Sequence, residues 1–155
     1  MALVFFVEKK DGKKWMVQDY RYLNEWIINN NYPLSLISDV LENIEMKKVF
    51  TKIDLRWGYN NMRIKEGDEW KVAFITLEGS FEPTVMFFRL TNLPATFQAM
   101  INELLRDLIN TGKVAVFIDD VIVGMDTEEE HNEIVVEMIR RLEKNDLYVK
   151  PEKYK

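Results

Sequence analysis

Two adjacent carboxylates, Asp119 and Asp120, lie inside an otherwise apolar stretch of this 155-residue chain. Apolar residues run through 114–118 and resume directly after the pair at 121–123, which predicts two buried strands joined by a tight turn with both carboxylates at its tip. Carboxylate oxygens are the ligands that Mg²⁺ prefers. The pair is therefore either an ordinary solvated turn or half of a two-metal site.

Turn chemistry alone does not account for the second carboxylate. A two-residue hairpin turn favours Asn-Gly, Asp-Gly or Gly-Gly because its central residues need positive φ, which Asp120 supplies poorly. A third carboxylate, Asp54, lies near the carboxyl end of residues 48–55, whose alternation predicts a strand. A lone Asp at a strand end is usually a cap or turn residue, so Asp54 is a candidate ligand only together with the pair.

Composition narrows the kinds of site that are available. The chain has no Cys and one His, His131, which excludes thiolate and all-imidazole metal sites. With 47% apolar and 12% aromatic residues, we expect one globular domain, or a piece of one, with a sizeable core. The net charge is −5, and the acidic excess lies in residues 101–155. This charge argues weakly against nucleic-acid binding, although a local basic strip could still contact phosphates.

The amino-terminal residues give an expectation about targeting. A short apolar run there has no basic segment before it and no cleavage-type small residues after it. We therefore expect an intracellular chain without a membrane span.

Lysines surround the first turn that the sequence predicts. Residues 3–9 and 14–20 flank Asp11-Gly12, a strong hairpin signal. The tip carries Lys9, Lys10, Lys13 and Lys14. They either protect the edge of an ordinary hairpin or form a flexible basic finger that grips phosphates.

Strands and helices are mixed along the rest of the chain. Further strands are predicted at 62–65, 70–76, 80–88 and 147–149. Helices are predicted after Ser38, over 94–112, and over 128–144, where Thr127 is the cap. This order predicts an α+β fold in which an antiparallel sheet is backed by helices on one face.

Seven short motifs occur in an order and spacing that identify a family. They are Lys-Lys-Asp-Gly (9–12), Asp-Tyr-Arg-Tyr-Leu-Asn (19–24), Phe-Thr-Lys-Ile-Asp-Leu (50–55), Gly-Tyr (58–59), Leu-Thr-Asn-Leu-Pro-Ala-Thr-Phe-Gln (90–98), Phe-Ile-Asp-Asp (117–120) and Glu-Glu-His (129–131). Each alone is weak, but together they make the chain resemble the reverse transcriptase of gypsy-like long-terminal-repeat retrotransposons over about residues 5–153.

The resemblance implies a single fingers and palm domain over 1–155, with about 1–47 and 62–93 fingers-like and the remainder palm. The thumb, the connection and ribonuclease H are expected to be absent. The implied function is an RNA-directed DNA polymerase core that transfers nucleotides from dNTPs to a primer 3′-hydroxyl on an RNA or DNA template. The rest of a retrotransposon polyprotein is the other expected partner, and the expected location is the cytoplasm or a retrotransposon particle.

The resemblance also assigns the metal site. Asp54, Asp119 and Asp120 would hold two Mg²⁺ or Mn²⁺ ions, with Asp120 the less essential ligand. One ion would lower the pKa of the primer hydroxyl and the other would neutralise the departing pyrophosphate. Lys153 is implied as a general acid for that pyrophosphate.

Further residues are implied to bind substrates. Tyr59 matches the steric gate that selects deoxynucleotides, and Phe117 holds a slot often taken by Tyr. The implied binding set is Lys9, Lys10, Lys14, Tyr59, Phe88, Arg89, Gln98 and Phe117. Asn24 belongs to a motif whose implied role is structural or template-facing.

Several residues depart from the family pattern. Trp15 stands where members usually carry an Arg that grips the triphosphate, and Trp57 stands where they carry a small residue. Arg89 replaces the Gly of a Pro-Phe-Gly run, at a backbone position that suits a side chain poorly. Asp146 likewise replaces a Gly.

These departures predict weak nucleotide binding and leave two interpretations open: an active polymerase core, or a catalytically silent remnant that binds nucleic acid or protein. A third, an unrelated α+β domain with a fortuitous Asp-Asp turn, has the ordered motifs against it.

Overall fold

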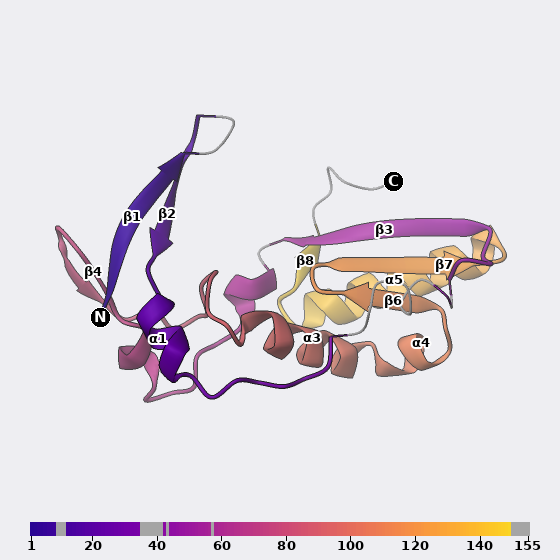
Figure 1. The fold of residues 1–155 in the computed structure, drawn as a ribbon. Helices are drawn as coiled ribbons and strands as arrows, with labels where there is room; N and C mark the ends of the chain where they lie inside the picture. The colour runs from indigo at the N-terminus through magenta and orange to yellow at the C-terminus, as the bar shows by residue number, and fades with distance from the viewer. Residues whose placement is uncertain (9–11, 35–41, 43, 57, 150–155) are drawn as a thin grey trace. The chain divides into compact units, whose positions relative to one another are not determined.

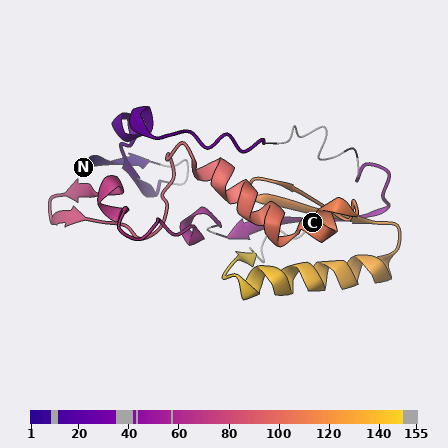
Figure 2. The same ribbon diagram turned by 90° about the horizontal axis from the view of Figure 1, so that it is seen from below.

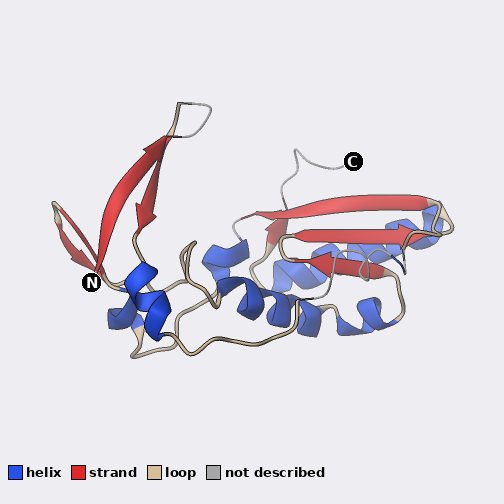
Figure 3. Cartoon of the chain, in the orientation of Figure 1, coloured by secondary structure: helices blue, strands red, loops and turns tan. Residues whose placement is uncertain are grey.

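The computed structural model describes all residues except 9–11, 35–41, 43, 57 and 150–155. The chain forms two compact units: Met1–Asn30 with Tyr59–Leu93 is unit 1, and Asn31–Gly58 with Pro94–Lys155 is unit 2. Both units contain helices and strands (Figure 1, Figure 3), and most strand pairs are antiparallel, which confirms the α+β class. Within the described residues, none of the helices has the length and apolar content needed to cross a lipid bilayer.

Unit 1 is built on a four-stranded sheet of order β2-β1-β4-β5. Its elements are β1 (Ala2–Glu8), β2 (Lys14–Gln18), α1 (Arg21–Trp26), η2 (Glu69–Val72), β4 (Phe74–Thr76) and β5 (Gly79–Phe81). β1 pairs antiparallel with β2, as the predicted hairpin requires, and parallel with β4. Gly12 in the connection has a φ of +77°, which suits its place in a tight turn.

A small core holds unit 1 together. Tyr20, Val72, Leu90 and Leu93 are its buried members. The Tyr20 hydroxyl donates to the Val72 carbonyl at 2.9 Å, which satisfies its polar end inside the core. Burial raises the pKa of the Tyr20 phenol to about 12.

Unit 2 contains a second sheet, of order β6-β7-β3-β8. Its elements are β3 (Val49–Arg56), α3 (Leu93–Leu104), α4 (Arg106–Asn110), β6 (Val114–Phe117), β7 (Asp120–Met125), α5 (Glu128–Lys144) and β8 (Tyr148–Val149). The 3₁₀ turn η1 (Gly58–Asn61) follows β3, where the chain passes from unit 2 to unit 1. All strand pairs in this sheet are antiparallel.

The two faces of this sheet have opposite character, because alternate residues of a strand point to opposite faces. Ile53, Val121 and Val123 are buried, and Figure 1 and Figure 2 place α3, α4 and α5 on one side of the strands. The other face carries Lys52 and Asp54. The core therefore lies on the helix side, and the predicted ligand Asp54 lies on the open side.

Several predicted elements are shorter than expected. The helix predicted over 94–112 is interrupted at Leu105, whose φ of −110° separates α3 from α4. The strand predicted at 62–65 is reduced to one bridge, between Arg63 and Val85. The predicted helix after Ser38 lies mostly outside the described residues. Helix α1 was not predicted, since six residues are too few to show a helical period.

Helix α5 has the ends that its sequence predicts. At its start, the Thr127 side chain accepts a hydrogen bond from the Glu130 amide at 3.4 Å. The acidic residues of the first turn lie at the positive end of the helix dipole, and Arg141 and Lys144 lie in the last turn, at its negative end.

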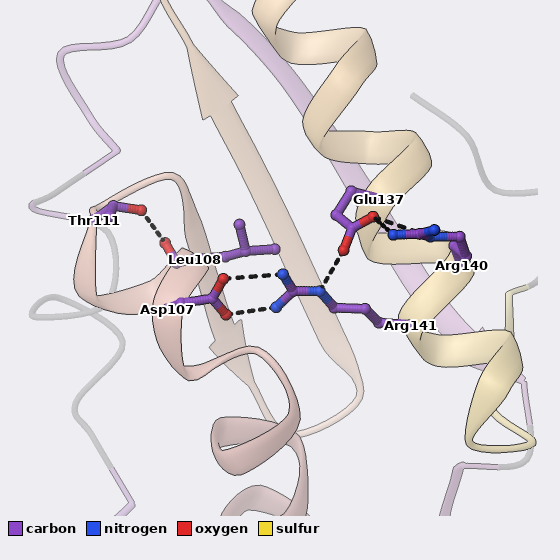
Figure 4. Close-up of polar contacts among 6 residues, drawn as sticks. All are labelled: Asp107, Leu108, Thr111, Glu137, Arg140 and Arg141. Atoms are coloured by element: carbon purple, nitrogen blue, oxygen red, sulfur yellow. Dashed lines mark hydrogen bonds and ion pairs between the residues drawn. The ribbon is translucent and has the colours of Figure 1, made fainter.

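Arg141 joins α5 to α4 (Figure 4). Its guanidinium forms two hydrogen bonds with Asp107, at 2.5 and 2.9 Å, and a third with Glu137, at 2.8 Å. The bonds from Arg141 lower the pKa of the Asp107 carboxyl, and bonds from Arg141 and Arg140 lower the pKa of Glu137. A lowered folded-state pKa stabilises the fold above the unfolded-state value, and this stabilisation is lost as the pH falls through the folded-state value.

Replacing Arg141 with Met therefore destabilises unit 2 near neutral pH and changes little in acid. We expect the difference in unfolding free energy between Arg141→Met and wild type to shrink as the pH falls from about 7 to about 3. Denaturant unfolding followed by circular dichroism at several pH values measures it. Arg106→Met, which removes a more exposed pair with Glu103, is the control. A difference that stays constant with pH would contradict the role given to these carboxylates.

Candidate active site

The hairpin turn lies one residue earlier than the sequence predicts. Phe117 pairs with Asp120, so Ile118 and Asp119 form the turn and Asp120 is the first residue of β7. The expectation that both carboxylates occupy the tip is therefore wrong for Asp120. Ile118 has a φ of +54°, a conformation that usually belongs to Gly and costs a β-branched residue about 1–2 kcal/mol.

This register places Asp120 directly opposite Asp54. The two are Cα partners in the β3–β7 ladder, and the Leu55 amide donates to the Asp119 carbonyl at 3.1 Å. Hydrogen-bonded and non-hydrogen-bonded pairs alternate in an antiparallel ladder, so Asp54 and Asp120 form a non-hydrogen-bonded pair, whose side chains approach most closely. Two carboxylates thus face one another on the open side of the sheet, beside the turn that carries Asp119.

A lysine also contacts this carboxylate pair. Lys52 precedes Asp54 by two residues and so lies on the same face of β3. Its Nζ donates to Asp120 Oδ2 at 2.8 Å. Like charges placed opposite each other destabilise a sheet, and the ammonium offsets part of that repulsion.

The donor set is chemically suited to a hard divalent cation. Asp54, Asp119 and Asp120 offer only oxygen atoms, each residue is half-buried, and two of them face each other. The side chains are not gathered into a binding cluster: among the described residues, no group of three or more His, Asp or Glu is arranged to hold a metal. An ion bound to Asp120 would share this carboxylate with the Lys52 ammonium, which lies 2.8 Å from Oδ2.

Gln98 holds the turn from the helix side. It lies on α3, is 4% exposed, and its Oε1 accepts from the amide of the strained Ile118 at 2.7 Å. Its Nε2 donates to the Val116 carbonyl at 3.2 Å and to Asn102 Oδ1 at 2.9 Å. One buried side chain therefore satisfies backbone groups at the end of β6 and in the turn. This places Gln98 in the support of the hairpin, and the substrate-binding role that the resemblance implies for it stays a prediction.

Unit 1 gathers several of the residues implied to bind nucleotide. The Phe88 ring makes edge contacts with Tyr59 at 5.5 Å and with Trp15 at 5.4 Å between ring centroids. The Arg89 guanidinium lies 5.6 Å from the ring centroid of Phe5. Trp15 and Phe88 are 44% and 39% exposed, so this aromatic cluster offers rings to solvent.

The backbone at Arg89 has the conformation expected of the replaced glycine. Its φ is +79°. Asn24 fixes this geometry, because its Nδ2 donates to the Arg89 carbonyl at 2.7 Å and its Oδ1 accepts from the Thr91 amide at 3.0 Å. The structure thus confirms that position 89 suits a side chain poorly.

Arg89→Gly should therefore stabilise the protein by about 1 kcal/mol, because glycine adopts positive φ without the Cβ penalty. Asp146→Gly should give a smaller gain, since Asp146, with a φ of +58°, is a residue type that tolerates this region. Urea unfolding measures both. A loss of stability in Arg89→Gly would show that the Arg89 contact with Phe5 outweighs the strain.

The remaining predicted residues are placed as follows. Lys14 is exposed on β2, and Phe117 is half-buried at the end of β6. Lys9, Lys10, Trp57 and Lys153 lie outside the described residues. Two residues of the site were not singled out from the sequence: Lys52, which alternation along β3 could have placed beside Asp54, and Ile118, whose strain has no sequence signal.

A family model described as "Reverse transcriptase (RNA-dependent DNA polymerase)" matches residues 7–155. The chain is 37% identical over 146 residues to the Transposon Tf2-3 polyprotein of Schizosaccharomyces pombe, and 36% identical over 146 residues to its Tf2-7 polyprotein. Each alignment covers 94% of this chain and 11% of the polyprotein. The chain thus spans about a tenth of the length of these relatives.

Solved structures agree with these sequence relatives. The native prototype foamy virus protease-reverse transcriptase matches with a TM-score of 0.87 and 27% identity, over 99% of this chain and 20% of that one. The foamy viral enzyme in complex with an RNA/DNA hybrid matches with a TM-score of 0.88 and 25% identity, over the same shares of the two chains. A dRH form in complex with double-stranded DNA matches with a TM-score of 0.88 and 26% identity, over 99% of this chain and 26% of that one.

Proposed function

Because the chain belongs to the reverse transcriptase (RNA-dependent DNA polymerase) family, we propose that it forms the nucleotidyl-transferring core of an RNA-directed DNA polymerase. The family membership confirms the resemblance to gypsy-like retrotransposon enzymes drawn from the motifs. The proposed reaction joins a dNTP to a primer 3′-hydroxyl and releases pyrophosphate.

One observation carries this proposal: Asp54 and Asp120 face each other across β3 and β7, next to Asp119 in the turn. Two opposed carboxylates destabilise a sheet, and Lys52 offsets only part of their repulsion, so a divalent cation would find a favourable place between them. The Asp120 side chain is 41% exposed on the open face of the sheet, so an ion from solvent can reach it.

Asp54 and Asp119 would be the principal ligands of two Mg²⁺ or Mn²⁺ ions, with Asp120 as the third. Such ions supply a lowered pKa at the primer hydroxyl and charge neutralisation at the departing pyrophosphate. The chain itself supplies position: the β3–β7 ladder sets Asp54 against Asp120, and Gln98 fixes the turn that carries Asp119. Lys153 remains the proposed proton donor to pyrophosphate.

Nucleotide selection is proposed for the aromatic cluster of unit 1. Tyr59 packs against the core of that unit and is braced by Phe88, so its ring is held in place as a steric gate requires. Trp15 supplies no charge for a triphosphate. The remaining positive groups proposed to contact phosphates are Lys9, Lys10, Lys14 and Arg89.

The proposed partners are a primer with an RNA or DNA template, and the rest of a retrotransposon polyprotein. The foamy viral relatives are described in complex with an RNA/DNA hybrid and with double-stranded DNA, and the Tf2 relatives are polyproteins. We also propose that the regions named fingers and palm correspond to parts of this chain, in the cytoplasm or a retrotransposon particle.

A silent nucleic-acid-binding remnant is the second candidate. The observation that favours it is the strained Arg89 in place of glycine, together with Trp15 in place of arginine. These residues weaken triphosphate binding without removing the fold.

Primer extension separates the two candidates. The wild-type chain is given an RNA template with an annealed DNA primer, Mg²⁺ and one dNTP at a time. We expect extension only with the complementary dNTP, and none with the double variant Asp119→Asn, Asp120→Asn. Extension by neither protein, with primer–template still bound in a filter assay, would replace the polymerase proposal with the remnant.

A further inference from the structure

Lys52 lies beside the three carboxylates, and as a cation it cannot be a metal ligand. We propose that Lys52 is a resident counter-charge that occupies Asp120 when no divalent ion is bound, so that its release sets the affinity of the site for the ion. This inference rests on the proposed function, because it assumes that Asp54, Asp119 and Asp120 bind a divalent cation.

The position of Lys52 follows from the β3–β7 register. Its Cα partner is Ile122, and Asp120 is the diagonal neighbour on the same face. A diagonal neighbour in an antiparallel pair is within reach of a long side chain, and the Nζ lies 2.8 Å from Asp120 Oδ2. The ammonium therefore holds one oxygen of a carboxylate that the proposed ion also needs.

The exposure of the pair makes this contact exchangeable. The Lys52 side chain is 56% exposed and that of Asp120 is 41% exposed. Ion pairs this accessible contribute little to stability, so breaking one costs little. The four-carbon stem of lysine lets the ammonium move aside without disturbing β3.

The Lys52 ammonium, 2.8 Å from Asp120 Oδ2, repels a divalent cation bound to the same carboxylate, which makes Lys52 a competitor for the ion. Without Lys52, Asp120 loses the ammonium beside its Oδ2, and a divalent ion gains more by binding. Lys52 thereby balances charge in the metal-free protein and raises the ion concentration at which the site fills.

The test measures binding of Mn²⁺ alone to the complete chain, by electron paramagnetic resonance of the free ion. We expect Lys52→Met to lower the dissociation constant about three- to fivefold. Lys52→Arg keeps the charge and should restore the wild-type value. Lys47→Met is the matched control, since it removes a similar ion pair, Lys47 with Asp126 at 2.8 Å, from the other end of the sheet.

Each outcome decides the matter. Unchanged or weaker binding by Lys52→Met would overturn the inference, as would equal tightening by Lys52→Arg or Lys47→Met. If wild type binds Mn²⁺ and Asp54→Asn abolishes that binding, the proposed metal site stands whatever Lys52 does. Absence of binding by both wild type and Lys52→Met would overturn the metal site and, with it, this inference.

Discussion

Asp119→Asn is expected to lower the rate of nucleotide incorporation by about a thousandfold, and Asp54→Asn by a similar factor. Asparagine keeps the shape of the side chain but removes the charge that would hold a divalent ion at the reacting oxygens, and such groups are worth several kcal/mol in the transition state. Asp120→Asn should lose less, about tenfold, because its carboxylate is shared with Lys52. Single-nucleotide incorporation under single-turnover conditions measures all three.

A stability measurement separates chemistry from folding in these variants. Removing one charge from the opposed Asp54 and Asp120 relieves repulsion, so Asp54→Asn should be at least as stable as wild type. Asp126→Asn, just beyond β7 and paired with Lys47, is the matched control and should keep full incorporation. If Asp119→Asn keeps its activity, the proposed catalytic role of Asp119 is wrong.

Gln98→Met is expected to destabilise the protein by about 2–6 kcal/mol and to reduce incorporation as well. Methionine fills similar volume, but it leaves the Ile118 amide and the Val116 carbonyl without their buried partner, at about 1–3 kcal/mol each. The positive φ of Ile118 then loses a contact that holds it. Urea unfolding and the incorporation assay measure the two effects.

Gln18→Met is the matched control for Gln98→Met. Gln18 is equally buried, at 3% exposed, yet in the described part of the chain its Nε2 has no hydrogen-bond partner. Replacing it removes a buried amide that is not fully satisfied, so we expect little loss of stability or a small gain. Equal losses in the two variants would mean that Gln98 acts through packing alone.

The sequence alone was enough to predict the candidate site residues and the structures that depend on neighbouring residues. The carboxylates Asp54, Asp119 and Asp120 and the motifs around them identify the family, because residue types at fixed spacing record the chemistry of a site. The hairpin after β1 and helix α5 were predicted because an Asp-Gly turn and a capping threonine act on near neighbours. The misfit of Arg89 was also visible, since the preference for glycine is a local backbone property.

The tertiary structure decided what depends on distant segments. The position of the turn at Ile118 and Asp119, and with it the pairing of Asp54 with Asp120, follows from the register of strands far apart in sequence. The same register brings Lys52 to Asp120 across 68 residues.

Packing between elements is equally hidden in the sequence. Gly58 is glycine because a Cβ there would lie 2.7 Å from the buried ring of Phe97. Gln98 supports the hairpin because α3 packs beneath it, which no periodicity in residues 93–104 reveals. Residue types thus determined which chemistry the chain can carry, whereas strand register and helix packing, which act between segments far apart in the chain, decided which side chains meet to perform it.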